Sequence, residues 1–282
     1  MSSLGGTEPA KAANQGNVPE ARADHWLRRH QLILYFALAY AISWPFWLLS
    51  HLAGGTLGTA LIVIGAFGPP IAAAITIRYT GGSLIEWLRR IVRWRAPVGC
   101  YAYALGLPIL IMGVMNATLA ALGKHPDLSL LAPRIPAYLQ TLLLTALIFG
   151  GQEEPGWRGF ALPRLEQRHS PLVATLILGL GWGVWHVPLY GPLGFVVPLV
   201  LAFFYTWLYN RTQSVLLCIL LHGSFTAAQD HLLLVADSAV VDAVLFGSYL
   251  VAAGVLVALT RGRLGLPRQQ DTSGGAAVHG RR

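Results

Sequence analysis

The chain has 282 residues, of which 55% are hydrophobic and only 11% are charged, with a formal net charge of +8 and a mean hydropathy of +0.55. A soluble domain carries charge on roughly a quarter of its residues, so this composition excludes an ordinary soluble domain. The positive charge does not indicate a nucleic-acid partner, because the basic residues lie in short segments between apolar runs. The sequence predicts an all-α, polytopic membrane protein that has the lipid bilayer as its surroundings.

Apolar windows predict about eight membrane-spanning helices in one transmembrane domain, residues 25–261. The polar segments on either side, residues 1–24 and 262–282, are expected to be disordered tails. The expected spans are residues 31–52, 57–77, 99–122, 136–154, 171–188, 194–209, 213–229 and 241–260.

The distribution of basic residues predicts the orientation of these spans. With a cytoplasmic N-terminus, 18 of the 20 lysines and arginines fall in cytoplasmic segments, and Lys124 and Arg134 lie outside. The positive-inside rule therefore places both termini in the cytoplasm of a multi-pass protein of the cell membrane. Residues 83–95 alternate apolar and basic side chains at helical spacing, which is typical either of a helix on the cytoplasmic leaflet or of a short solvated connector.

Two adjacent carboxylates, Glu153 and Glu154, follow an apolar run in a chain with only 12 acidic residues. Ionisable groups at membrane depth are energetically expensive and indicate a functional site. Glu154 and Arg158 are four residues apart with the acid first, so we expect them to form an ion pair. Glu153, about 100° around the helix, then faces elsewhere. We expect one long helix through this segment, kinked at Pro155.

Two histidines of later spans are expected near these carboxylates. Glu153 and His186 each lie 15 residues from the turn that joins their spans, and therefore about 22 Å from it. His222 reaches about 16 Å from the same side by the same arithmetic, and Thr226 shares its helix face. Taken singly, each histidine is compatible with a core position and the acidic pair with a structural ion pair. Their conjunction indicates a site.

These residues resemble the CAAX-protease and bacteriocin-processing family of intramembrane glutamic endopeptidases. The family usually has phenylalanine or another aromatic residue at the first position of its second motif, and asparagine at the last position of its third. The family's architecture also resembles the expected helices, which would enclose an intramembrane active-site cavity. The matching motifs, in the family order, are Glu153-Glu154-x-x-x-Arg158, Trp182-x-x-x-His186 and His222-x-x-x-Thr226.

The resemblance implies an intramembrane protease that needs no cofactor. Glu153 and His186 would activate a water for attack on a peptide carbonyl, and His222 with Thr226 would hold the oxyanion. The substrate would be a peptide or protein in or at the membrane, with a prenylated CAAX end as one option. The implied catalytic residues are Glu153, Glu154, Arg158, His186, His222 and Thr226.

Three alternatives stay open. One glutamate and two histidines are also the ligand set of a catalytic zinc site, so Glu153, His186 and His222 are candidate zinc ligands of a metalloprotease. A noncatalytic peptide-binding or immunity protein of the same fold would need no reaction. A transporter would use the buried acids as a proton relay, but the chain has no internal repeat or paired broken helices to support this.

Overall fold

The computed structural model describes residues 28–236 and 238–266, and within these ranges the chain forms helices and no strand. The expected tail at residues 1–24 and most of the tail at 262–282 lie outside the described residues. Seven of the described helical stretches are long and apolar enough to cross a membrane. The prediction of an all-α polytopic membrane protein is confirmed.

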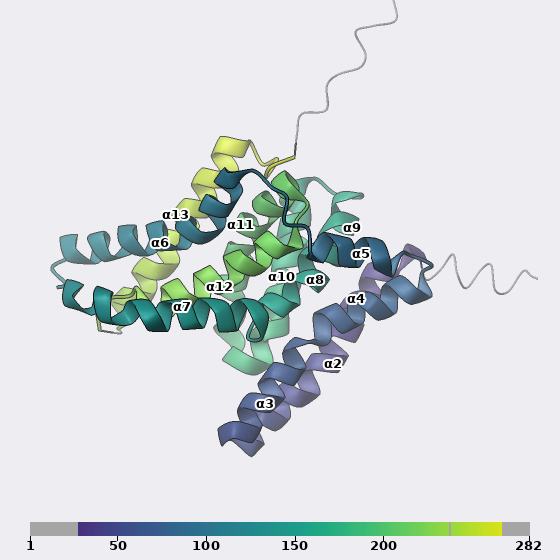
Figure 1. Ribbon diagram of the computed structural model, residues 1–282, viewed down its shortest axis with the longest axis horizontal. Coiled ribbons are helices and arrows are strands. Elements are labelled where there is room, and N and C mark those ends of the chain that lie inside the picture. Colours follow the sequence, from purple (N-terminus) through teal and green to yellow (C-terminus); the bar gives the residue numbers. More distant parts are fainter. Residues whose placement is uncertain (1–27, 237, 267–282) are drawn as a thin grey trace, which may run out of the picture.

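The helices follow one another along the chain with short connections (Figure 1). They are α2 (Gln31–Ala53), α3 (Gly55–Ala66), α4 (Gly68–Tyr79), α5 (Leu84–Ile91), α6 (Val98–Ala121), η1 (Leu128–Leu130), α7 (Leu131–Leu147), η2 (Gly151–Glu153), α8 (Glu154–Gly156), η3 (Trp157–Ala161), α9 (Leu162–Glu166), α10 (Pro171–Tyr190), η4 (Pro192–Phe195), α11 (Val196–Thr212), α12 (Val215–His231) and α13 (Ala239–Thr260).

The expected spans correspond to these helices with two refinements. The expected span 57–77 is divided into α3 and α4, which meet at Phe67. The expected span 213–229 is α12, whose 17 residues make it about 26 Å long, shorter than the seven apolar stretches. The expected spans therefore correspond to helices, except that the span 136–154 is interrupted at residues 148–150.

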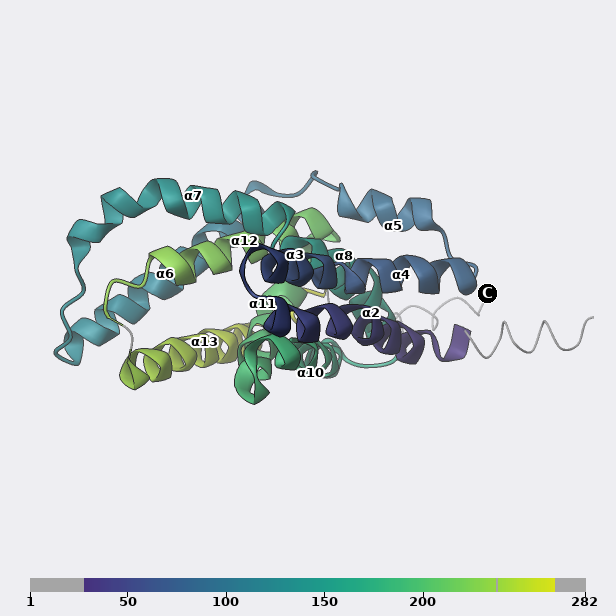
Figure 2. The same cartoon turned by 90° about the horizontal axis from the view of Figure 1, so that it is seen from below.

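The helices that carry the histidines lie at the centre of the molecule. α12 packs against α6, α7 and α11, and α10 packs against α11 and α2. Figure 2 shows α12 between α7 on one side and α13 on the other. Gly223 allows a close approach of α12 to α7, because a Cβ at this position would lie 2.4 Å from the backbone oxygen of Leu142. Small residues at helix contacts permit this packing in membrane proteins, so α12 is held deep among its neighbours.

The prediction of one long helix through the carboxylates was wrong. α7 ends at Leu147, and Gly150 then adopts a φ of +159°, which ends the helical path before the carboxylates. The chain resumes as a 3₁₀ turn (η2), a short α-helix (α8) and a π-helical turn (η3). Pro155 lies in the first turn of α8, where its missing N–H interrupts no hydrogen bond, so it does not kink a helix.

The amphipathic segment forms α5, which contacts the backbone of this irregular stretch. The hydroxyl of Ser83 accepts a hydrogen bond from the backbone N–H of Glu86 and caps the helix. Trp87 turns inward and donates its Nε1–H to the carbonyl oxygen of Pro155 at 2.9 Å. Irregular backbone at membrane depth needs such partners from neighbouring helices, so α5 helps to hold α8 in place.

Candidate active site

Glu154 is the centre of a buried charge cluster. Its side chain is fully buried, and Nη1 of Arg158 donates to both carboxylate oxygens, at 3.0 and 2.9 Å. The ion pair expected from the spacing is therefore present. Nδ1–H of His222 donates to the same carboxylate at 2.9 Å. His222 thus contacts Glu154, and this contact joins α12 to α8.

Two aromatic rings enclose the charge of Arg158. Its guanidinium carbon lies 4.2 Å from the ring centroid of Trp182 and 4.2 Å from that of Tyr205. Such cation–π contacts are stronger when the cation is removed from water, as it is here. Nε and Nη2 of Arg158 make no hydrogen bond to the described residues. The cation is therefore held by Glu154 on one edge and by the two rings.

Glu153 lies in a separate environment from its neighbour. Its side chain is 4% exposed, and Nε1–H of Trp182 donates to its Oε2 at 2.8 Å. The carbonyl oxygen of the same tryptophan accepts a hydrogen bond from Nδ1–H of His186 at 2.9 Å. Trp182 therefore contacts Glu153 through its side chain and His186 through its backbone, and places both at one level of the bundle.

The hydrogen bond to Trp182 determines the tautomer of His186. A carbonyl oxygen only accepts, so Nδ1 carries the proton, and in the neutral ring Nε2 has a free lone pair. The ring is nearly buried among Trp47, Trp185 and Tyr190, with ring centroids 6.1, 4.9 and 5.6 Å away. These contacts fix the orientation of the imidazole. His186 can therefore accept a proton or a hydrogen bond through Nε2.

Gly150 makes a close approach to His222 that only glycine permits. A Cβ at this position would lie 2.5 Å from Nε2 of His222. We expect Gly150→Ala to displace the imidazole from Glu154 and to remove most of any activity that depends on this contact. Gly123→Ala is the matched control, because Gly123 also has a positive φ, +78°, with no atom within 4 Å. Gly123→Ala should lose about 1 kcal/mol of folding stability, and Gly150→Ala should lose more because it also displaces His222. Equal loss of activity in the two variants, measured beside their melting temperatures, would contradict the role of this contact.

The remaining expected residue, Thr226, lies one helical turn beyond His222 on α12. Its hydroxyl makes no hydrogen bond to the part of the chain that the structure describes. The expected zinc ligands Glu153, His186 and His222 also do not form a ligand set, since no three His, Cys, Asp or Glu side chains among the described residues are grouped to hold one metal ion. His222 instead directs Nδ1 at Glu154. The present arrangement does not fit a zinc site.

Two contributors were missed or underestimated in the sequence. The donor role of Trp182 toward Glu153 was not expected, although its position four residues before His186 makes it part of a motif. Tyr205 on α11 was not singled out at all. It contacts both Arg158 and His222, with 5.9 Å between the tyrosine and histidine rings. A tyrosine in an apolar span has no motif around it, so no sequence signal identifies it.

Comparisons with known proteins match the segment of the chain that carries these residues. Residues 135–228 match a protein-family model described as type II CAAX prenyl endopeptidase Rce1-like. A protein of Methanococcus maripaludis named CAAX prenyl protease 2 is 33% identical over 136 residues, which cover 41% of this chain. The match spans about half of that relative, 48% of its length. The segment that carries all three motifs is therefore similar to type II CAAX prenyl endopeptidases.

Proposed function

We propose that this protein is an intramembrane endopeptidase that hydrolyses a peptide bond in a substrate held in or at the membrane. The observation that carries the proposal is the link through Trp182, which holds the carboxylate of Glu153 and the imidazole of His186 together. Both groups keep acceptor lone pairs, and both are almost completely buried. Such a pair can bind and deprotonate one water molecule.

In the proposed reaction, Glu153 is the general base. It removes a proton from the water while Nε2 of His186 accepts the second O–H as a hydrogen bond and orients the oxygen. The water oxygen forms a bond to the substrate carbonyl carbon, and the carbonyl oxygen becomes an oxyanion. When the C–N bond breaks, Glu153 returns its proton to the leaving amine. General acid–base catalysis of this kind contributes about 10² to 10⁴ in rate.

His222 and Thr226 are the proposed oxyanion donors. The protonated form of His222 keeps Nδ1–H on Glu154 and offers Nε2–H to the oxyanion. The hydroxyl of Thr226, one turn away, is free to donate a second hydrogen bond. Loss of one oxyanion donor typically costs about 10² to 10³ in rate. In this scheme Glu154 and Arg158 do not contact the substrate; they orient His222.

The comparisons support the proposed substrate class. The matching family description and the name of the relative both refer to CAAX prenyl proteases. A peptide with a prenylated C-terminal segment is therefore the first substrate to assay. The basic residues favour cytoplasmic termini. With that orientation, the proposed cleavage takes place in the membrane on a segment supplied from the cytoplasmic side.

Comparative proteomics of membrane fractions tests this proposal. Cells with Glu153→Gln or His186→Ala protein should accumulate the same uncleaved precursors, which disappear when the wild-type protein is restored. A phenotype of the wild-type protein that survives both substitutions, with no precursor accumulating, would favour a noncatalytic peptide-binding or immunity role instead.

A second experiment tests the proposed absence of a metal. We expect the purified protein to contain substoichiometric metal and to retain its cleavage rate in a chelator. Metal content by mass spectrometry and cleavage before and after chelation provide the measurement. Stoichiometric zinc, with activity lost on chelation and regained on adding zinc, would identify a metalloprotease.

A further inference from the structure

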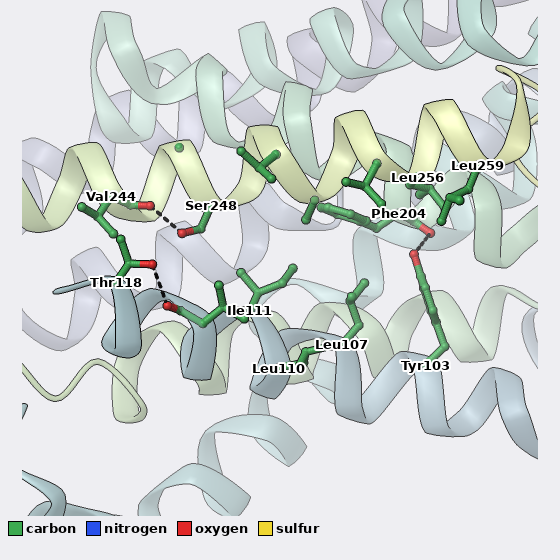
Figure 3. Close-up of a pocket in the computed structure, with 15 residues that line it drawn as sticks. Tyr103, Leu107, Leu110, Ile111, Thr118, Phe204, Val244, Ser248, Leu256 and Leu259 are labelled. Atoms are coloured by element: carbon green, nitrogen blue, oxygen red, sulfur yellow. Dashed lines mark hydrogen bonds between the residues drawn. The ribbon is translucent and has the colours of Figure 1, made fainter. Parts of the chain in front are cut away.

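An apolar groove lies between α6 and α13, away from the candidate active site (Figure 3). Its volume is about 620 Å³, within the roughly 300–1,000 Å³ of ligand pockets. None of the motif residues lines it. The lining is mainly hydrocarbon and includes Leu107, Ile111, Phe204, Val251 and Leu256.

The hydroxyl groups in the groove already have partners. Thr118 and Ser248 donate to the backbone oxygens one turn earlier in their own helices, at 2.9 and 2.7 Å. The hydroxyl of Tyr103 donates to the carbonyl oxygen of Phe204 at 3.5 Å. Figure 3 shows these bonds along the groove wall. A polar ligand would therefore find few free donors, and a hydrocarbon chain fits the lining better.

The groove is long enough for one acyl chain. It follows α6 from Tyr103 to Thr118, which at 1.5 Å per residue is about 22 Å. Half of a typical bilayer core is about 15 Å thick. An acyl chain anchored at one membrane surface can therefore lie inside the groove over its whole extent. α13 runs antiparallel to α6 here, because Leu259 lies at the Tyr103 end and Val244 at the Thr118 end (Figure 3).

The charges at the two ends of the groove differ. At the Tyr103 end, the exposed residues Arg261 and Arg263 follow α13, and the exposed Arg95 precedes α6. At the other end, the acidic Asp242 lies two residues before Val244 and offsets Lys124, which follows α6. Juxtamembrane arginines attract anionic lipid headgroups, by about 1 kcal/mol per residue. An anionic headgroup is therefore favoured at the Tyr103 end.

We propose that the groove between α6 and α13 is a binding site for an anionic phospholipid. One acyl chain lies along the groove, and the headgroup meets Arg261, Arg263 and Arg95. The site is independent of the proposed catalytic reaction, because it uses none of the same residues. Phe204 adjoins Tyr205, so the bound chain packs against the helix that contacts Arg158.

A groove-filling substitution tests the acyl-chain part. Gly247 lines the groove, and no atom lies within 4 Å of a Cβ added to it. We expect Gly247→Leu to lower the amount of dioleoylphosphatidylglycerol retained per protein about tenfold. This change corresponds to the loss of binding from about two buried methylene groups of the acyl chain. Gly106→Leu is the matched control, since Gly106 is equally open but lies outside the lining. Lipid extraction and mass spectrometry of detergent-purified protein provide the readout.

A second comparison tests the headgroup part. Nanodiscs with phosphatidylglycerol should raise the melting temperature of the wild-type protein above its value in phosphatidylcholine alone. The double variant Arg261→Gln/Arg263→Gln should lose this difference and bind phosphatidylglycerol about fivefold or more weakly.

Three outcomes would overturn the proposal. The first is equal lipid retention by Gly247→Leu and wild-type protein. The second is that a farnesylated peptide competes with the lipid for the groove. The third is a change of oligomeric state in Gly247→Leu, which would assign the groove to a second copy of the chain.

Discussion

Glu153→Gln is expected to lower the kcat/KM of peptide cleavage by about 10³ or more while the protein remains folded. Glutamine keeps the shape of glutamate, and its amide oxygen can still accept the hydrogen bond from Trp182. It cannot accept the proton of the attacking water, so only the chemical step is lost. The measurement is the cleavage rate of a lipid-modified peptide by reconstituted protein, beside its thermal unfolding.

Glu166→Gln is the matched control for this variant. Glu166 accepts a hydrogen bond from Asn210 at 2.7 Å, and a glutamine oxygen preserves that contact. The control should therefore cleave at the wild-type rate. A Glu153→Gln protein with more than about a tenth of wild-type activity would remove Glu153 from the role of base, since general acid–base catalysis contributes at least about 10².

Arg158→Met is expected to have the largest effect on stability. It leaves the carboxylate of Glu154 fully buried without its cation, and breaking one partner of a buried ion pair typically costs about 3–5 kcal/mol. The double variant Glu154→Gln/Arg158→Met removes both charges and should regain most of this loss. The free energy of unfolding of the wild-type protein, the single variants Arg158→Met and Glu154→Gln, and the double variant, measured in a denaturing detergent, gives the coupling between the two side chains.

The control for the ion pair is Arg164→Met. Arg164 donates to the side chain of Gln31 and to the backbone oxygen of Phe160, neither of which carries a charge. Its loss should cost only about 1–3 kcal/mol. A coupling between Glu154 and Arg158 close to zero would mean that His222 and the two aromatic rings, rather than the ion pair, stabilise this cluster.

Much of the fold could be predicted because its signals are local. Apolar windows identified the spans, since a helix in lipid must satisfy its own backbone groups along its own length. The ion pair of Glu154 and Arg158 followed from a spacing of four residues. The common level of Glu153 and His186 followed from counting residues to a shared turn, and their shared contact Trp182 agrees with it.

The remaining features depend on contacts between distant segments. The helix break before Glu153 was missed, because the periodicity of the apolar residues continues across Gly150 and conceals its positive φ. The contact of His222 with Glu154 arises from the packing of α12 across α7 and α8. The sequence of one helix does not show where the others lie in space. Pro155 was taken for a kink because proline also occurs in the first turn of a new helix.

The two hydrogen bonds of Trp182 would respond differently to substitution of this residue. Its backbone carbonyl, which holds the tautomer of His186, would survive any substitution at this position that preserves the helix. Its indole N–H, which binds Glu153, would not. A phenylalanine at this position would keep the backbone partner of His186 but leave Glu153 without the indole donor. The side chain at position 182 thus determines how Glu153 is held, and the backbone at the same position determines the tautomer of His186.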